Sequence, residues 1–369
     1  MSLSTTNARR SPPPNTLERP ADRGSDYARL CREVRSAGLL RRRPGAYALQ
    51  FAATLALLGS TILAIVLLGN SWFQLIAALV LGIAFTQAAF LGHDGGHQQV
   101  FATRRANDLL GQLMGNVLVG LSFGWWVAKH NRHHANPNKE AHDPDIGDGV
   151  LAFTTQQVAA RTGALGRSIT RWQAWLFFPL LTFEGLNLHV ASVRSLLPGA
   201  DRSARGGRRT SEAMLLMLHA VVYVGGLLLV MSPLKALAFA AVNQAAFGMY
   251  MGCSFAPNHK GMPTIPPDQN LDHLRRQVLT SRNVRGGLVT DVVLGGLNYQ
   301  IEHHLFPNMP RYALRRAQPI VRRYCSGLGI PYVETSLVGS YAVVLRYLDD
   351  LGAPLRALRG MERDAAERA

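Results

Sequence analysis

The chain has 369 residues, of which 48% are hydrophobic and 17% are charged, and its formal net charge is +16. The hydrophobic residues are gathered in a few long blocks, which excludes intrinsic disorder for the middle of the chain. Three widely spaced cysteines, Cys31, Cys253 and Cys325, exclude a disulfide scaffold and a cysteine zinc site. The excess of basic residues suits either a nucleic-acid-binding protein or a basic membrane protein.

The first 45 residues precede the apolar blocks and are predicted to be a cytosolic segment. Residues 1–26 are rich in Ser, Pro and Arg and lack an apolar stretch beside Met1, so we expect disorder and no signal peptide. Residues 27–40 place Tyr27, Leu30 and Val34 on one helical face. This pattern predicts an amphipathic helix that lies on a membrane surface.

Four apolar blocks are long enough to cross a bilayer as helices. Only Asn70 and Ser71 separate the first two blocks, and Ser232 and Pro233 separate the last two, so we expect two hairpins. The expected spans cover residues 46–70, 72–92, 213–231 and 234–256.

Two further stretches are ambiguous. Residues 107–128 and 172–197 are largely apolar but contain scattered polar side chains. We expect each to be a helix that lies in the membrane interface or dips into it. Two additional spans are the alternative.

The basic residues predict the orientation of the chain. All but one of the 39 Lys and Arg residues fall on one side of the four expected spans, and the exception, Lys235, lies at a hairpin tip. The positive-inside rule assigns that side to the cytoplasm, together with both termini. A basic membrane surface needs no nucleic acid, so no nucleic-acid partner is predicted. The expected organisation is a cytosolic segment 1–45, a membrane region 46–345 and a cytosolic tail 346–369.

Twelve histidines are present, and most of them fall in three clusters. The clusters are HDGGH, with His93 and His97; HNRHH, with His130, His133 and His134; and QIEHH, with Gln300, His303 and His304. We expect His189, His219 and His273 to be ordinary structural histidines. All three clusters lie on the expected cytoplasmic side, so they are expected to converge at one site.

The spacing of these histidines indicates a metal site. Positions i and i+4 share one face of a helix, so His93 and His97 reach the same ion, as do His130 and His134. His133 points about 100° away from His134, so an adjacent pair can serve two ions. A mononuclear zinc site needs only three or four ligands, so this many histidines suits two ions. Imidazole alone does not select among iron, zinc, copper and nickel.

Other metal proteins fit less well. None of the nine glutamates is followed by histidine three residues later, which excludes the soluble di-iron bundle. HDGGH lacks the glutamate of the H-E-x-x-H peptidases. A haem held by two histidines would need paired histidines within the spans, where only His219 lies. A histidine-rich centre for two metals beneath four membrane helices remains.

HDGGH, HNRHH and NYQIEHHLFPNMPR resemble the three histidine boxes of the membrane fatty acid desaturase superfamily, over roughly residues 45–340. The Q-x-x-H-H form of the third box resembles front-end acyl desaturases. The resemblance implies an all-α membrane protein with four transmembrane helices in two hairpins, and a cytosolic helical cap that holds two non-haem irons beside a buried acyl channel. Front-end enzymes commonly carry a fused cytochrome b5 domain with an HPGG motif, and this motif is absent here. A separate donor, of ferredoxin or cytochrome b5 type, is therefore expected.

The implied function is an oxygen-dependent desaturase that introduces a double bond into a long acyl chain, using dioxygen and two external electrons. The substrate is expected to be an acyl-CoA or an acyl-lipid in the bilayer. The alternative enzyme is a hydroxylase of lipid, alkane or carotenoid on the same scaffold. A metal transporter is the alternative from another class, although its histidines would line a path within the spans.

The resemblance also assigns roles to residues, with the di-iron centre itself catalytic and no separate acid or base. The implied iron ligands are His93, His97, His130, His133, His134, His259, His303 and His304. Gln300 stands where related boxes carry a histidine, and the alternatives for it are weak binding, binding through water, or no binding. Four acids in or near the boxes are candidates for orienting the histidines, with ordinary surface acids or helix caps as the alternative: Asp94, Asp143, Asp145 and Glu302. Four arginines are candidates for holding an acyl-CoA phosphate, with ordinary positive-inside charge as the alternative: Arg104, Arg105, Arg282 and Arg285.

Overall fold

The computed structural model describes residues 25–197 and 206–366. Regular structure in these residues is almost entirely helical, and its strands are the two-residue parallel pair β1 (Asn283–Val284) and β2 (Glu334–Thr335). The predicted all-α membrane fold is confirmed. The expected disorder of residues 1–26 falls almost wholly on residues that lie outside the described ranges.

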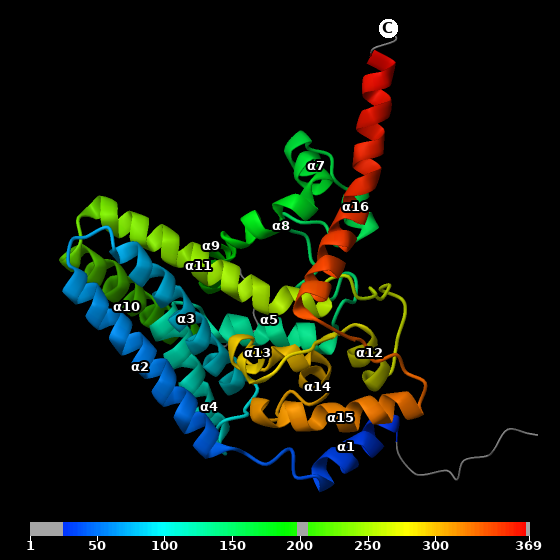
Figure 1. Cartoon of the computed structure of the whole chain (residues 1–369), viewed down its shortest axis with the longest axis horizontal. Helices are drawn as coiled ribbons and strands as arrows, with labels where there is room; N and C mark the ends of the chain where they lie inside the picture. The colour runs from blue at the N-terminus through cyan, green and yellow to red at the C-terminus, as the bar shows by residue number, and fades with distance from the viewer. Residues whose placement is uncertain (1–24, 198–205, 367–369) are drawn as a thin grey trace, which may run out of the picture.

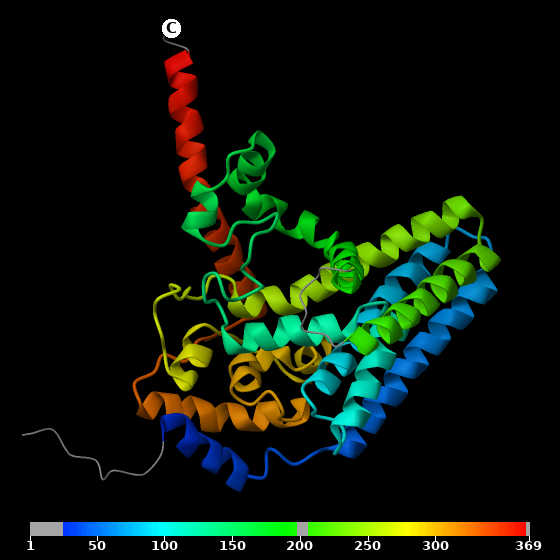
Figure 2. The same cartoon turned by 180° about the vertical axis from the view of Figure 1, so that it is seen from behind.

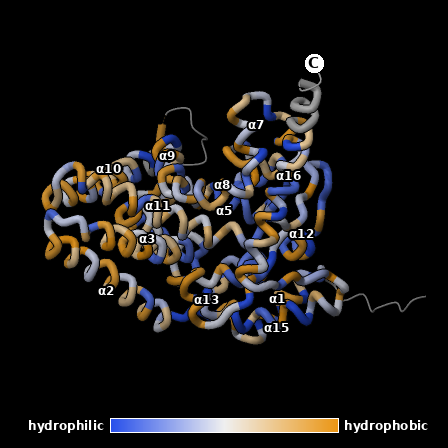
Figure 3. The backbone as a smooth tube through the Cα atoms, turned by 45° about the horizontal axis from the view of Figure 1, so that its top comes forward, coloured by the Kyte–Doolittle hydropathy of each residue, from blue (hydrophilic) through white to orange (hydrophobic). Residues whose placement is uncertain are grey.

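Four long helices form a bundle at one end of the molecule (Figure 1). They are α2 (Pro44–Leu68), α3 (Gln74–Gly96), α10 (Gly206–Val230) and α11 (Pro233–His259). Their most apolar stretches have mean hydropathies from 1.2 to 2.4, which suits membrane spans, and hydrophobic colours dominate this end of the molecule in Figure 3. The apolar stretch of α3 is 61% buried, whereas those of α2 and α10 are 11% and 6% buried. α3 is therefore the centre of the bundle, and α2 and α10 present apolar side chains outward.

Polar contacts join the two hairpins at their tips. The Gln74 amide donates to the carbonyls of Ile65 at 2.7 Å and Gly69 at 2.8 Å, which satisfies the end of α2. The Ser232 backbone N–H donates to Asn70 Oδ1 at 3.0 Å. Both expected hairpins are therefore present, and their tips lie together.

Helices α3 and α11 pack closely because of a glycine. A Cβ atom added at Gly82 would lie 2.8 Å from the Cβ of Ala246, which no real side chain tolerates. Asn243 extends the contact: its amide donates to the Ala78 carbonyl at 3.2 Å and accepts from Tyr223 at 2.9 Å. This polar side chain thus joins three helices inside an apolar bundle.

The stretch 107–128 is not one helix, so that prediction was wrong. It is divided among α4 (Arg104–Gly111), a π-helical segment η1 (Gln112–Val119) and α5 (Phe123–Ala135). Gly120 separates the last two with a left-handed φ of +80°, and Ser122 Oγ accepts from the Trp125 N–H at 3.2 Å to start α5. His189 and His219 bond the η1 carbonyls of Val119 and Val117 at 3.0 and 2.9 Å, so they are structural, as expected.

The stretch 172–197 also differs from the prediction. It forms α8 (Gln173–Leu181) and α9 (Glu184–Leu196), which meet at a bend of 70°. α9 packs on α11, where a Cβ at Gly248 would lie 2.4 Å from the Gly185 nitrogen. The bent pair therefore packs on α11 of the bundle and does not form one straight helix.

A helical cap covers the end of the bundle where α3 and α11 finish. Its elements are α12 (His273–Leu279), α13 (Leu288–Val293), the 3-10 turn η2 (Leu297–Tyr299), α14 (Gln300–Leu305) and α15 (Arg311–Gly327). Helix α1 (Asp26–Ser36) forms as predicted, but Leu30 and Val34 are fully buried against α12, α14 and α15. Its apolar face thus belongs to the cap core, and the prediction that it lies on a membrane was wrong for that face.

A second arm of the molecule packs around the last helix. α16 (Leu337–Ala366) contacts α6 (Thr155–Ala159), α7 (Ala164–Arg171) and α8 through small apolar clusters. Figures 1 and 2 show this arm on the side of the cap opposite α1 and α15. α16 is continuous through residues 345 and 346, where the sequence suggested that a separate tail begins.

Candidate metal centre

The first histidine pair lies where α3 leaves the bundle. α3 continues beyond the expected end of the second span, so His93 lies in its last turn and His97 caps it. The two rings are 4.7 Å apart between centroids, as expected for positions i and i+4. Asp94 Oδ1 lies 3.2 Å from His93 Nδ1 and accepts its ring hydrogen.

The second cluster lies on α5. This helix begins at the Ser122 N-cap and contacts α3. The rings of His130 and His134 are 4.5 Å apart between centroids, whereas those of His130 and His133 are 6.0 Å apart. His133 turns away, and its Nδ1 lies 2.9 Å from Asp143 Oδ1. The adjacent histidines of this cluster therefore face different neighbours.

The third cluster lies on the short, fully buried helix α14. The ring centroid of His303 is 4.8 Å from that of His93. His304 faces the end of α11, where its Nε2 lies 3.1 Å from His259 Nε2. Four separate segments thus bring their histidines to one place.

Two groups of histidine nitrogens result. In each group, one ring nitrogen of every member lies within 4.8 Å of those of the others. The first group is His93, His97, His130 and His303, and the second group is His133, His259 and His304. His134 lies between them: its Nε2 is 3.1 Å from His130 Nε2, and its ring stacks on His304 with centroids 4.1 Å apart.

In the second group, every Nδ1 has an acceptor, so in the neutral, metal-binding form of each ring the Nε2 carries a lone pair. The Nδ1 atoms of His133, His259 and His304 lie 2.9, 3.0 and 2.9 Å from Asp143 Oδ1, the Thr280 carbonyl and Gln277 Oε1. The Nε2 of His259 faces those of His133 at 3.3 Å and His304 at 3.1 Å. Lone pairs at these distances repel one another, and a cation among them would turn this repulsion into coordination.

The first group also fits a cation. Among the described residues, the buried Nε2 atoms of His93, His97 and His303 have no hydrogen-bond partner. Buried polar atoms are rarely left in this state, because each costs about 1–3 kcal/mol. Both groups of donors therefore fit metal ions that imidazole binds.

Burial keeps most of these rings neutral, which is the form that binds metal. Desolvation, aided by neighbouring imidazoles, lowers the pKa values of His97, His130, His134, His303 and His304 well below the ordinary histidine value. Burial also opposes the charge on His133, but Asp145 and Asp143 outweigh it and raise the pKa of that ring.

Gln300 lies beside the second group. Its amide nitrogen is 2.9 Å from His259 Nε2, and its Oε1 accepts from Asn258 at 3.4 Å. The amide is thus at the position that a fourth ring would take, and it is 2% exposed.

Asp94 and Arg311 form a buried ion pair beside the first group, with a contact from Arg311 Nε to Asp94 Oδ2. Tyr47 donates to the same carboxylate oxygen at 3.0 Å. The Arg311 backbone N–H donates to Gln99 at 3.2 Å, which fixes the start of α15. Asp94 therefore connects His93 to α2, at Tyr47, and to α15.

The second group has two carboxylates near His133. Asp143 accepts from the backbone N–H groups of Asn138 and Asp145 at 2.7 and 2.9 Å, in addition to its contact with His133. Asp145 Oδ2 lies 3.5 Å from His133 Nδ1, and its other oxygen pairs with Lys129. Burial favours the neutral form of Asp145, but Lys129 outweighs this effect and holds the pKa of Asp145 well below its usual range.

Glu302 does not contact a histidine through any hydrogen bond found among the described residues. Its carboxylate accepts from Asn283 and Tyr332, both at 2.7 Å. Asn283 Oδ1 in turn accepts from the Ile301 N–H at 2.9 Å, so Glu302 supports the backbone of α14. Burial raises the pKa of Glu302 to about 7. The expectation that it orients a ring directly is corrected, because it faces away from the rings on its short helix.

Several contacts were invisible in the sequence. Gln277 on α12 accepts from His304 and also donates to the His134 carbonyl at 2.9 Å. Thr280 contributes only its backbone carbonyl, and Arg311 acts through Asp94. No motif or spacing marks these residues, because each reaches the histidines from a different element of the cap.

The arginine candidates separate into exposed and buried residues. Arg282 is 1% exposed, and it donates to the Pro257 and Lys260 carbonyls, each at 2.8 Å. It therefore stabilises the end of α11 and is not available to a phosphate. Arg104 is exposed and lies 3.8 Å from Asp108.

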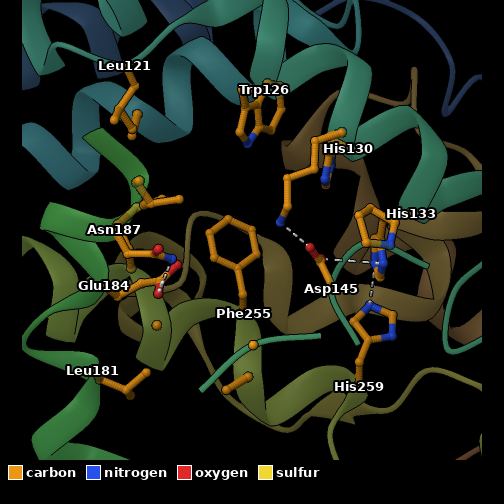
Figure 4. Close-up of a pocket in the computed structure, with 18 of the residues that line it drawn as sticks. Leu121, Trp126, His130, His133, Asp145, Leu181, Glu184, Asn187, Phe255 and His259 are labelled. Atoms are coloured by element: carbon orange, nitrogen blue, oxygen red, sulfur yellow. Dashed lines mark hydrogen bonds and ion pairs between the residues drawn. The ribbon is translucent and has the colours of Figure 1, made fainter. Parts of the chain in front are cut away.

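A cavity of about 580 Å³ adjoins both histidine groups (Figure 4). His130, His133 and His259 line one side of it in Figure 4, and the ion pair of Lys129 with Asp145 also belongs to its lining. Apolar side chains form most of the other walls, among them Val119, Leu121, Phe177, Leu181, Leu188 and Phe255. An apolar chain of moderate length would fit beside the histidines.

Comparison with known proteins identifies the family. The family model described as fatty acid desaturase matches residues 70–336. This chain belongs to the fatty acid desaturase family. The predicted superfamily resemblance is therefore confirmed, and the four apolar helices and the histidine cluster agree with a membrane-bound, metal-binding oxidoreductase of that family.

Curated relatives agree with this assignment. A Delta(8)-fatty-acid desaturase of Helianthus annuus is 28% identical over 344 residues, covering 89% of this chain and 73% of the relative. A Delta(8)-fatty-acid desaturase of Euglena gracilis is 30% identical, covering 88% of this chain and 78% of the relative. A Delta(5) fatty acid desaturase of Caenorhabditis elegans is 31% identical, covering 86% and 71%.

Proposed function

We propose that this family member is an oxygen-dependent acyl desaturase with two iron ions. The observation that supports this most strongly is the pair of histidine groups, whose ring nitrogens face one another at the edge of an apolar cavity. Membership of the fatty acid desaturase family gives the class of substrate, a long acyl chain.

In this proposal each histidine group holds one iron. His93, His97, His130 and His303 hold the first, and His133, His259 and His304 hold the second. His134 is a ligand between them, and Gln300 contributes its amide weakly or through water. Iron bound there would supply the power to reduce dioxygen and to remove hydrogen from an unactivated methylene.

The chain's own residues bind, orient and desolvate. Asp94, Asp143 and Gln277 hold His93, His133 and His304 through Nδ1, so that each Nε2 faces its group. The apolar cavity walls would hold the acyl chain beside the histidines and limit the access of bulk water.

The reaction balances with outside electrons. Two hydrogen atoms leave neighbouring carbons, a C=C bond forms, and dioxygen takes these atoms with two electrons and two protons to give two waters. We propose that a separate one-electron carrier of ferredoxin or cytochrome b5 type supplies the electrons. The substrate would be an acyl-lipid or an acyl-CoA, as the fatty-acid and sphingolipid desaturases among the relatives suggest.

A product assay tests this proposal. Membranes containing the protein receive a reductant, dioxygen and a deuterium-labelled acyl-lipid, and the products are identified by mass spectrometry while iron is counted in the purified protein. We expect about two irons per chain. The expected product is an alkene into which no oxygen atom has been inserted. A hydroxylated product without alkene would indicate a lipid, alkane or carotenoid hydroxylase instead of a desaturase. Zinc uptake into vesicles by a protein that contains no iron would indicate a transporter.

We also propose that both termini and all histidine clusters face the cytoplasm. The distribution of the 39 basic residues supports this orientation. A reporter protein fused after Ala369 should be active only when it remains inside the cell. Activity confined to the outer face would contradict the orientation and the access of a cytosolic electron carrier.

A further inference from the structure

Three helices form an arginine-rich outer wall of the cap: α1, α12 and α15. Helix α1 packs on α12 and α15, and both α12 and α15 pack on α14, which carries His303 and His304. Together they contain ten arginines but only two acidic residues, Asp26 and Glu33. Arg311 alone among these arginines is buried in the ion pair with Asp94, so the outer wall keeps a strong positive charge.

Part of the outer wall lies far from the ends of the membrane spans. Figures 1 and 2 both show α12 at the end of the cap away from the bundle, with α15 and α1 running beside it. Positive charge that orients membrane helices is needed next to the spans. The arginines of α12 count towards the orientation of the chain, and their position at the far end of the cap also leaves them available to a protein partner.

Only one helix separates this surface from the histidines. Gln277 on α12 accepts from His304 Nδ1 and donates to the His134 carbonyl, both at 2.9 Å. Arg276, the neighbouring residue, donates to the Ala135 carbonyl at the end of α5 at 2.8 Å. A helix with its side chains is about 10–12 Å across. A partner that binds on α12 therefore lies within roughly that distance of the second and third histidine clusters.

We propose that the outer wall is the docking surface for an acidic one-electron carrier protein, and that α12 is the shortest route from this carrier to His304. This inference rests on the proposed function, which requires two electrons in each turnover. At each docking event a reduced carrier is oxidised by one electron and the metal centre is reduced by one. Electron tunnelling weakens steeply with distance, so the carrier must dock where the covering layer is thinnest.

Charge complementarity selects an acidic partner. Asp26 and Glu33 are bonded within the wall to Arg275 and Arg323, at 3.4 and 2.5 Å. Two acids beside the wall, Asp272 and Asp291, pair with Arg275 at 2.8 Å and Arg315 at 3.7 Å. These four acids are still outnumbered by the ten arginines, and Arg316 and Arg322 remain exposed on α15. Such a surface accelerates the encounter with an acidic protein, and the effect weakens with salt.

Charge reversal in the full-length protein, embedded in nanodiscs of neutral lipid, tests the inference. The test variant is Arg275→Glu with Arg322→Glu, and the matched control is Arg167→Glu with Arg346→Glu, exposed arginines on the opposite arm. The dissociation constants of oxidised soluble cytochrome b5 and of a plant-type ferredoxin are measured at low and high salt. Metal content and the unfolding midpoint verify the fold, and Arg316→Glu replaces the double variant if it fails this check.

We expect the wall variant to weaken binding of at least one carrier about tenfold at low salt and much less at high salt, with the control within about twofold of the unchanged protein. Carrier-driven desaturation should fall, while desaturation driven by a small chemical reductant should not. Equal weakening by both variants would overturn the inference, as would an effect that appears only in anionic lipid. Absence of alkene with the chemical reductant, despite normal carrier binding, would instead contradict the proposed function.

Discussion

The two histidine groups are built differently. In the first, four imidazoles meet at the end of the membrane bundle, and its strongest support is the buried pair of Asp94 with Arg311. In the second, three imidazoles meet Gln300, and each ring is held by a different part of the cap. The first group therefore depends on the bundle and on α15, whereas the second depends on the assembly of the cap.

This difference has a chemical consequence. Gln300 turns its amide nitrogen towards His259 and its oxygen towards Asn258, and even with the amide turned over its oxygen is a weaker donor to iron than an imidazole nitrogen. We therefore expect the second group to bind its ion less tightly and to leave room for a further ligand. The following changes test this comparison through metal content and activity.

Removing one ring from either group should have the largest effect. His259→Ala should lose one iron, because only two rings remain in the second group, and His303→Ala should lose the iron of the first group. Desaturation should be undetectable in both variants, as in His304→Ala. Metal analysis and product assays measure these losses, and His142→Ala, at an exposed histidine, is the control. Two irons and full turnover in His259→Ala would exclude that residue as a ligand.

Loss of an orienting carboxylate should rank next. Asp143→Asn leaves a single oxygen for His133 and two backbone N–H groups, so the second iron should bind about 10–100-fold more weakly. Asp94→Asn should instead affect the first iron. Competition with a chelator measures the affinity, and Asp268→Asn, at an exposed acid, should match the unchanged protein. If both variants lose the same iron, the two groups are not independent.

Gln277 gives a smaller and more selective test. Gln277→Leu removes the acceptor of His304 Nδ1, so the second iron should bind about tenfold more weakly and its Mössbauer signal should broaden. Gln277→Glu keeps an acceptor and should restore most of the binding. A purely structural role would lower the unfolding temperature in Gln277→Leu without selective change in the second iron signal.

Gln300 should have the smallest effect on metal content. Gln300→Ala should keep most of both irons and lose activity, because the amide is a weak ligand beside three rings. Gln300→His should bind the second iron more tightly. Loss of a whole iron in Gln300→Ala would show that the amide is a full ligand and that the two groups are equivalent.

Much of the fold followed from local patterns. The four spans and two hairpins could be predicted because membrane insertion depends on the length and polarity of each segment alone. The opposite directions of His303 and His304 agree with helical periodicity, whereas His134 lies between the two groups. By contrast, residues 107–128 were predicted to form one helix, and the chain breaks at Gly120. The left-handed φ of Gly120 and its close contact with His219 depend on the tertiary structure, so the sequence did not indicate this break.

The sequence by itself determined the membrane helices, the three histidine clusters and their helical spacing, because these depend on neighbours within a few residues. The tertiary structure alone decided which rings share a group, the burial of Arg282 beneath α11, and the contact of Gln277 with His304. Those contacts join residues far apart in the chain, and local propensity carries no information about them. The burial of α1 in the cap was decided in the same way, because an amphipathic face packs equally well on lipid or on protein.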